Sequence, residues 1–461
     1  MNCYPGSLLP TPLRPLALAA LTGVACLACT APGRVPIAAA RTQTSPPVSD
    51  PTPPSEPRFE GFARSAASEG GLTAYVALGL AESPRLAALR ARVEAAGERG
   101  AQASALPNPT FSWTEFLEEV ETRTGPNERR YRLDQPLPWP GVRAARGDLA
   151  DAEAAALAST LAVEEAALVE RIEGAWLDLA YAHERVASLA EELELLESLG
   201  SVVQARVESG GPREDWLKLE IAVARAEDAL AGARAGLGPL SARLSALCGI
   251  DFDGRPLAAD LDDAPIQAVD AAAFEQAARA ASPRLERLAS DIASAEAARA
   301  VAERADRPSL AVGVEYVDIG DALDPSTPGA GDDPFALRFS IGLPVWRSSY
   351  AAARREAERS ERAARLELDA GRFELEAELT AARFELDDAE RKQRLCEEVL
   401  LPRAREAYEL TRASYAVGEA SLTELIDAER ALLDLDLETA RAVLDRGRAL
   451  ARLRALAGAM P

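Results

Sequence analysis

The sequence predicts a mainly α-helical protein with a small β part, built from two copies of one unit. Three observations predict this fold class. Alanine, leucine, arginine and glutamate dominate long stretches of the 461 residues and only 5% of the chain is aromatic, which is typical of long packed helices. Short motifs recur in the same order in both halves. Each half also contains two segments in which apolar and polar residues alternate, a period that predicts strands.

The internal repeat sets the domain boundaries. The Ser-Pro-Arg-Leu motif at residues 83–86 recurs at 282–285, and the motif at 109–111 recurs at 308–310 with the same spacing of 199 residues. A Leu-Pro pair and a glycine turn recur later in the same order, which indicates a duplicated supersecondary unit. Five segments are expected in chain order: a signal peptide at 1–26, a flexible tether at 27–70, a first repeat at 71–250, a connector at 251–270 and a second repeat at 271–461.

The N-terminus has the pattern of an export signal. Arg14 precedes an apolar run, residues 16–27, that is too short to cross a bilayer. Small residues before Cys26 match a bacterial lipoprotein cleavage site, with Cys29 as the second choice. An ordinary signal peptide with incidental cysteines is the alternative. Residues 42–57 are rich in Pro, Ser and Thr, which predicts a flexible tether because this composition cannot bury a core.

Each repeat is expected to begin with a helix, over residues 73–105 and 271–305, and to continue into a strand pair. In residues 310–316 and 335–343, apolar residues occupy one face and polar or small residues the other. The first repeat has the same pattern in a rougher form. Strands of roughly ten residues that are apolar on one face suit a transmembrane β-barrel. A half-buried sheet in a soluble protein is the alternative.

The connections at the two ends of these strands differ. Residues 117–130 and 318–334 are long and polar, whereas the other ends are sharp and rich in proline. Trp139 and Trp346 stand at matching points where strand gives way to helix; an indole suits the membrane–water interface, although a Trp can also cover such a joint in a soluble core. Four strands cannot enclose a lumen, and an open edge in lipid leaves backbone groups unsatisfied. If the strands span a membrane, several chains must therefore share one barrel.

Long helical rods are expected after each strand pair. Residues 141–200 and 348–417 contain no residue that must end a helix except Pro402, which should bend or interrupt the second rod. Roughly 60–70 helical residues make a rod on the order of 100 Å long. Such a rod cannot fold back into one globule, so it must pack along other rods.

Both rods are expected to turn back at glycine. Gly210 and Gly211 precede Pro212, which suits the first turn of the following helix. Gly418 can end its helix with a positive φ, and residues 421–424 have the pattern of a capping box. The sequence therefore predicts two helical hairpin tips.

Composition and motifs argue against catalysis and against nucleic acid. The net charge of −23 excludes the clustered basic residues that phosphate binding needs. His183 is the only histidine, and no phosphate-binding loop, Cys-x-x-Cys pair or nucleophile elbow is present. Cys248 and Cys396 are expected to be small buried residues without a disulfide. No catalytic residue, cofactor or metal site is predicted, and the many helical carboxylates are expected to form solvated faces.

The expected order of elements occurs once in each half of the chain. This order resembles that of the TolC family of outer-membrane factors. Residues 415–418 and 422–429 resemble the family's second hairpin tip, and residues 108–109 and 134–137 resemble its strand starts and ends. The resemblance covers about residues 72–458. It implies a homotrimer with a twelve-stranded β-barrel in the outer membrane, in contact with its lipid, continued by a periplasmic α-helical barrel.

The resemblance also implies a function. The chain would be the outer-membrane channel of a tripartite efflux system, a passive duct that docks on a periplasmic adaptor and an inner-membrane pump. Residues 135–141 look more like the heavy-metal branch of the family than the drug branch. Two other functions remain open: a soluble periplasmic coiled-coil adaptor or scaffold, and a hydrolase on a helical scaffold. An adaptor would carry compact β-domains, and no convergent nucleophile and base supports a hydrolase.

The family constricts its tunnel near the second tip. Glu424 and Asp427 are three residues apart and share a helix face, so three copies would form two acidic rings that favour cations. Tyr415 precedes this tip by one turn, and Asp215 holds the related place after the first tip. Together these residues form the expected periplasmic gate. The alternative for the acids is stabilisation of the helix N-terminus.

The tips are the expected adaptor-docking surface. Val417 and Gly418 form it at the second tip, and Gly210 and Gly211 form it at the first. The first tip lacks the Val-Gly pair that is common in the family, so docking is expected to rely more on the second tip.

Overall fold

The computed structural model describes residues 71–251, 253–254, 257–261 and 270–459, all within the compact unit Arg58–Pro461. The predicted signal peptide and tether, and with them Cys26 and Cys29, lie outside these residues. In chain order the elements are α2 Leu72–Glu82, α3 Pro84–Ser104, β1 Thr110–Val120, β2 Asn127–Leu137, α4 Val142–Glu208, α5 Arg213–Cys248, α6 Ala271–Ala281, α7 Pro283–Arg304, β3 Ser309–Ile319, β4 Phe335–Gly342, α8 Arg347–Leu395, the π-helix η2 Cys396–Leu400, α9 Leu401–Val417 and α10 Leu422–Ala457.

The first helix of each predicted repeat is two helices, which corrects the expectation of one helix over 73–105 and one over 271–305. The break falls at Ser83 between α2 and α3 and at Ser282 between α6 and α7. A residue before proline is driven out of the helical region, and both serines have extended ψ angles, 116° and 129°. The following proline then occupies the first position of the next helix.

The long rods form as expected. Helix α4 has 67 residues, so it is about 100 Å long at a rise of about 1.5 Å per residue. The second rod is interrupted where Pro402 was expected to act: η2 inserts a π-helical segment before α9. Pro402 has no N–H to offer the carbonyl four residues back, and the wider π turn accommodates this missing bond.

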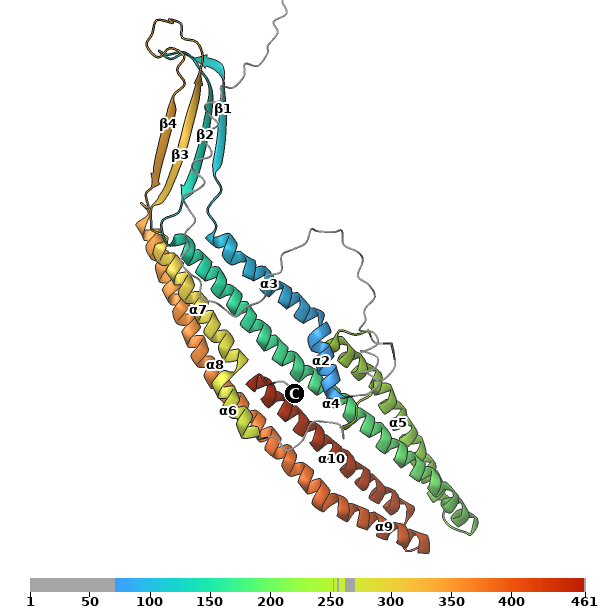
Figure 1. Cartoon of the computed structure of the whole chain (residues 1–461). Helices are drawn as coiled ribbons and strands as arrows, with labels where there is room; N and C mark the ends of the chain where they lie inside the picture. The colour runs from blue at the N-terminus through green and yellow to red at the C-terminus, as the bar shows by residue number, and fades with distance from the viewer. Residues whose placement is uncertain (1–70, 252, 255–256, 262–269, 460–461) are drawn as a thin grey trace, which may run out of the picture. The chain divides into compact units, whose positions relative to one another are not determined.

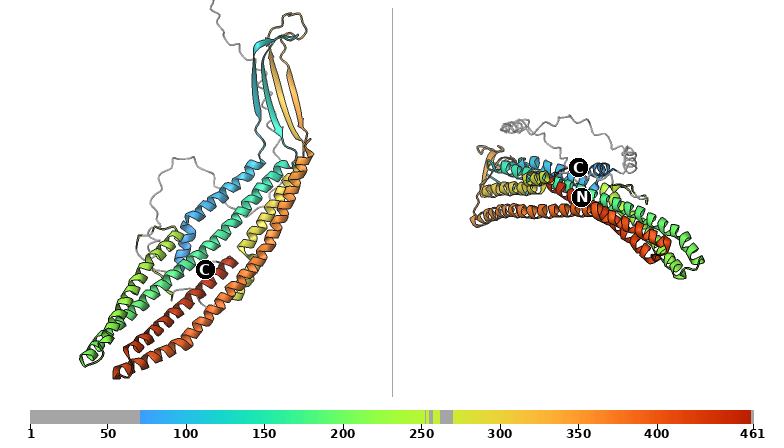
Figure 2. Two further views of the ribbon diagram at one scale, coloured as in Figure 1. Left: turned by 180° about the vertical axis from the view of Figure 1, so that it is seen from behind. Right: turned by 90° about the horizontal axis from the view of Figure 1, so that it is seen from below.

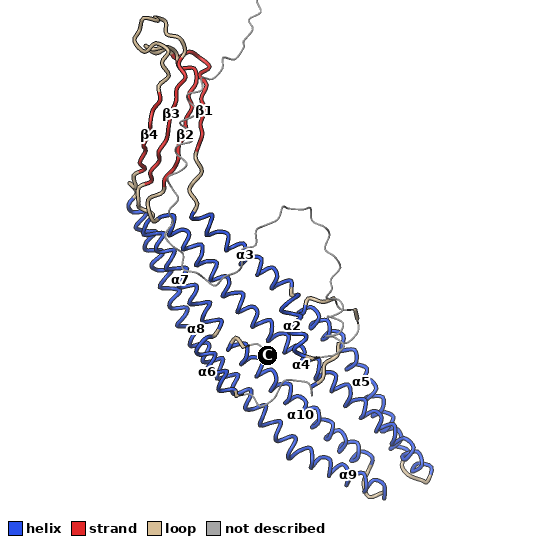
Figure 3. Tube along the Cα trace, in the orientation of Figure 1, coloured by secondary structure: helices blue, strands red, loops and turns tan. Residues whose placement is uncertain are grey.

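The strands form one antiparallel sheet in the order β1-β2-β3-β4. They come together beyond the ends of α3, α4, α7 and α8, to which they are joined (Figure 3). Strand β1 continues through polar residues to Val120, so the first connection is the short segment 121–126 instead of the predicted 117–130. The second connection, 320–334, is long as expected.

The helices pack along one another, with the hairpins α4–α5 and α9–α10 side by side in both views (Figure 1, Figure 2). One core cluster surrounds Trp176 of α4 between α2 and α5, a second joins the two tips, and a third joins α6, α8 and α10. Cys248 and Cys396 are buried free thiols, as predicted. Nε2 of His183 lies 2.8 Å from the carbonyl oxygen of Leu257.

Candidate functional site

One face of the sheet is apolar across all four strands. Directly paired residues of an antiparallel sheet point to the same side, so the register defines the face. Leu133 of β2, for example, pairs with Phe111 on one side and with Val314 on the other, and Val314 pairs with Leu337. The apolar members of this face are Phe111, Trp113, Tyr131, Leu133, Leu137, Leu310, Val312, Val314, Tyr316, Phe335, Leu337, Phe339 and Ile341. Phe339 is 80% exposed, so this chain does not cover the face by itself.

The opposite face of the sheet is polar and charged. Glu315 of β3 lies 3.0 Å from Arg132, 3.1 Å from Arg338 and 3.4 Å from Arg130. These four residues, the Glu315 cluster, connect β2, β3 and β4. The cluster surrounds one carboxylate with three arginines, and Asp134 of β2 adds a second acid to the same face.

Each outer strand of the sheet has one side without a partner strand among the described residues. Strand β1 pairs only with β2, and β4 pairs only with β3. The N–H and C=O groups along these two edges therefore need another partner if the sheet lies in lipid. Trp346 is 75% exposed directly after β4, and Trp139 is half-buried after β2, at the joints with α8 and α4 where the sequence placed them.

The first tip ends α4 with two glycines. Gly210 has a φ of 99°, which favours glycine, and the N–H of Gly211 donates to the carbonyl of Arg206 at 2.9 Å. Pro212 is the N-cap residue of α5, one position earlier than predicted, and makes no side-chain capping bond.

The second tip is defined by local hydrogen bonds, as the sequence predicted. Gly418 has a φ of 84°, and its N–H closes the end of α9 on the carbonyl of Tyr415 at 3.1 Å. The hydroxyl of Ser421 accepts from the N–H of Glu424, and the carboxylate of Glu424 accepts from the N–H of Ser421 at 2.7 Å. This reciprocal pair is the predicted capping box. Val417 next to the glycine is 73% exposed.

Two cations of the first tip reach the second. The guanidinium carbon of Arg206 lies 4.8 Å from the centre of the Tyr415 ring, and an Arg206 nitrogen donates to the Tyr415 carbonyl at 3.4 Å. The ammonium of Lys218 donates to the hydroxyl of Thr423 at 3.2 Å. The sequence did not single out Arg206, Lys218 or Thr423, because each pair is separated by more than 200 residues in the chain and leaves no local pattern.

The predicted gate residues have different surroundings. Tyr415 is buried between the tips, and this burial raises the pKa of its hydroxyl. Glu424 is engaged in the capping box, whose hydrogen bonds lower its pKa, so it has the helix-start role that the sequence left as an alternative. Asp427 is exposed, and Asp215 is half-buried near Tyr415. The structure thus joins Tyr415 to the first tip through Arg206, and leaves Asp427 free to face solvent.

A known protein family matches part of the chain. The model of the outer membrane efflux protein family matches residues 275–459. This part of the chain is therefore similar to that family. No curated protein matched. As an outer-membrane efflux channel the protein is not an enzyme, and the soluble adaptor alternative is not favoured.

Solved structures share the fold of this efflux protein. The outer-membrane channel OprN has a TM-score of 0.67 at 17% identity, covering 87% of this chain and 92% of its own. MtrE of Neisseria gonorrhoeae, an outer membrane channel in its open state, also has a TM-score of 0.67 at 17% identity, covering 85% and 89%. CusC has a TM-score of 0.66 at 14% identity, covering 85% and 92%.

Two features are absent from the described residues. None of the helices there combines the length and the apolar character that a membrane crossing demands. Likewise, no group of three or more His, Cys, Asp or Glu in that part of the chain is arranged to hold a metal ion.

Proposed function

We propose that three copies of this efflux protein form one passive channel, with a twelve-stranded barrel in the outer membrane and a helical barrel in the periplasm. The two-faced sheet with open edges carries the proposal. Its apolar face suits lipid, and its Glu315 cluster suits a water-filled lumen. Pairing β1 of one copy with β4 of the next satisfies both edges, and three sheets of four strands close the ring.

Exposed apolar residues on the helices support packing between copies. Leu366, Phe373 and Phe384 of α8 are 58%, 79% and 70% exposed, and their spacings of seven and eleven residues place them on one face. Leu217 and Ile221 are exposed one turn apart on α5. Faces of this kind are typical of helices that pack against a second chain.

The tips would connect the channel to its partner proteins and control the width of its periplasmic entrance. Val417 and Gly418, with Gly210 and Gly211 at the first tip, would dock on a periplasmic adaptor, and an inner-membrane pump would supply the energy. Tyr415, Asp427 and Asp215 would narrow the entrance, with Glu424 fixing the start of α10 and Arg206 holding the two tips together.

The remaining proposals concern the membrane and the cargo. Trp139 and Trp346 would anchor the sheet at the periplasmic interface, because indoles favour that zone. Lipidation, on Cys26 or else Cys29, would assist placement. The heavy-metal branch is proposed from residues 135–141 alone, since CusC is no more similar to this chain than OprN or MtrE.

Cell fractionation followed by sizing in mild detergent tests the proposal. The mature chain should be found with the outer membrane and run as a trimer. A soluble monomer after lysis would overturn it. Mass spectrometry of the mature N-terminus decides the lipid: an unmodified terminus beyond Cys29 excludes it.

A further inference from the structure

Glu429 of α10 is a buried acid without a partner. Its side chain is 5% exposed, and neither carboxylate oxygen has a hydrogen-bond partner among the described residues. The expectation that helical carboxylates form solvated faces is therefore wrong for this residue. Burying a carboxylate costs free energy unless it is paired or protonated, and no hydrogen bond among the described residues offsets that cost here.

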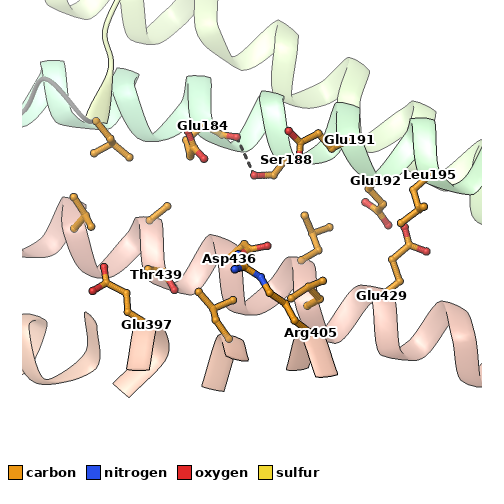
Figure 4. A pocket seen from close by; sticks show the side chains of 16 residues that line it. Glu184, Ser188, Glu191, Glu192, Leu195, Glu397, Arg405, Glu429, Asp436 and Thr439 are labelled. Carbon is orange, nitrogen blue, oxygen red and sulfur yellow. Dashed lines mark hydrogen bonds and ion pairs between the residues drawn. The ribbon is translucent and has the colours of Figure 1, made fainter. Parts of the chain in front are cut away.

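Glu429 lines a cavity of about 540 Å³ between α4, α10 and the η2–α9 segment. In Figure 4 its carboxylate reaches across the gap toward Glu192 of α4. Six acids line the cavity against one base, Arg405, which lies 3.8 Å from Asp436. The acids are Glu184, Glu191, Glu192, Glu397, Glu429 and Asp436.

Burial and a neighbouring acid favour the neutral form of Glu429. Burial raises the pKa of Glu429 to about 7, the negative charge of Glu192 adds to the rise, and Arg430 opposes it. Burial also raises the pKa values of Glu192 and Asp436. The charged and titratable groups that face this region from the packed elements are Glu184, Glu191 and Glu192 of α4, Glu397 of η2, Arg405 and Tyr408 of α9, and Arg430, Asp434 and Asp436 of α10.

The spacing of the acids indicates the shape of cation that would fit the cavity. Glu184 and Glu191 are seven residues apart on α4, and Glu429 and Asp436 are seven apart on α10, so each row is about 10 Å long. The acids are not gathered into a metal-binding group anywhere in the described chain. Leu195, Leu432 and Leu433 also line the cavity. Separated negative charges in a cavity that also has an apolar lining fit a cation whose charges are separated by methylene groups.

We propose that this cavity binds a linear di- or polyamine, with one ammonium group held between Glu429 and Glu192 and another beside Glu184 and Asp436. The methylene chain lies along the leucines. Glu429 binds the amine in its ionised form, so the complex releases a proton where the acid was protonated. The proposal does not rest on the trimeric channel, because all the named residues belong to one copy of the chain.

Isothermal titration of the full-length protein in detergent with spermidine tests the site. At pH 8 we expect saturable binding of one spermidine per chain. Glu429→Gln keeps the side-chain shape and should weaken binding at least about ten-fold, because it removes a buried charge-assisted hydrogen bond. The matched control is Glu438→Gln, an exposed acid of α10 outside the cavity, which should leave the affinity unchanged.

Two further readouts separate a built site from general attraction to an acidic surface. Binding should weaken from pH 8 to pH 6 as Glu429 takes up its proton, and Glu429→Gln should remove most of that pH dependence. Mg²⁺ at equal total charge should displace spermidine poorly. Equal effects of the two substitutions, efficient displacement by Mg²⁺, or no saturable binding would overturn the proposal.

Discussion

The two hairpin tips turn the chain in the same direction but are stabilised differently. The second tip has its own capping box and displays Val417 beside Gly418. The first tip makes no side-chain cap on α5, yet it supplies Arg206 and Lys218, which reach the second tip. The difference indicates a division of roles: the second tip has a fixed shape suited to docking, and the first tip holds it in place.

Replacing the glycine at either tip, Gly418 or Gly210, by a residue with a large side chain should separate these roles most clearly. Gly418→Leu should abolish export, because a side chain at a φ of 84° is strained by about 1–2 kcal/mol and alters the docking surface. Trimer formation and single-channel conductance should persist. Export is measured as substrate accumulation in cells that carry the pump and adaptor.

The matched control is Gly210→Leu, which meets similar strain at a φ of 99° on the first tip. It should reduce export far less. Equal loss in the two variants would show that docking uses both tips alike.

Loss of the link between the tips should have the next largest effect. Arg206→Ala removes the contact with Tyr415, so the tips should separate more easily and single-channel conductance in planar bilayers should rise. Arg213→Ala removes the same charge from an exposed position on α5 and should conduct like the parent. If both variants conduct alike, Arg206 does not hold the tips.

The acids after the second tip should tune ion selectivity. Glu424→Ala with Asp427→Ala should raise conductance and lower cation preference, since three copies lose six negative charges. The single substitutions should assign most of the selectivity change to Asp427, because Glu424 is engaged in its cap. A double variant that conducts like the parent, with unchanged selectivity, would place the gate elsewhere.

The capping box should give the smallest and most local effect. Ser421→Ala should destabilise the start of α10 by about 0.5–2 kcal/mol, visible as faster amide exchange in its first turn. Hydrogen bonds from Ser421 lower the pKa of Glu424, so its part of the cap should persist until the pH falls below the usual carboxyl range. Ser209→Ala at the first tip should leave exchange at the start of α5 unchanged, because no side chain caps that helix.

Local signals in the sequence predicted much of this molecule. The second tip follows from residues within one turn of each other, and β3 and β4 follow from their alternation. The end of β1 was missed because the strand passes through a register shift between Glu115 and Val120, after which Val120 pairs with Asn127 of β2. Pairing between strands is decided by tertiary structure, so it leaves no pattern among neighbouring residues of the sequence.

The site was predicted less completely than the fold, for the same reason. Arg132 and Glu315 are 183 residues apart, and Arg206 and Tyr415 are 209 apart, so neither contact could be read from spacing. The burial of Glu429 depends on the packing of α4 against α10. Its sequence neighbourhood is that of any exposed helical acid.

Cross-linking between the sheet edges tests the central claim, that three copies close one barrel, most directly. Single cysteines along β1 would be combined with single cysteines along β4 in a chain whose Cys29, Cys248 and Cys396 are replaced by serine. Within one chain the two edges are three strand spacings apart, about 14 Å, which is too far for a disulfide. The account predicts that, at the matching register, oxidation links chains into species of two and three copies and no larger. Monomers at every register, or a ladder that continues past three copies, would contradict it.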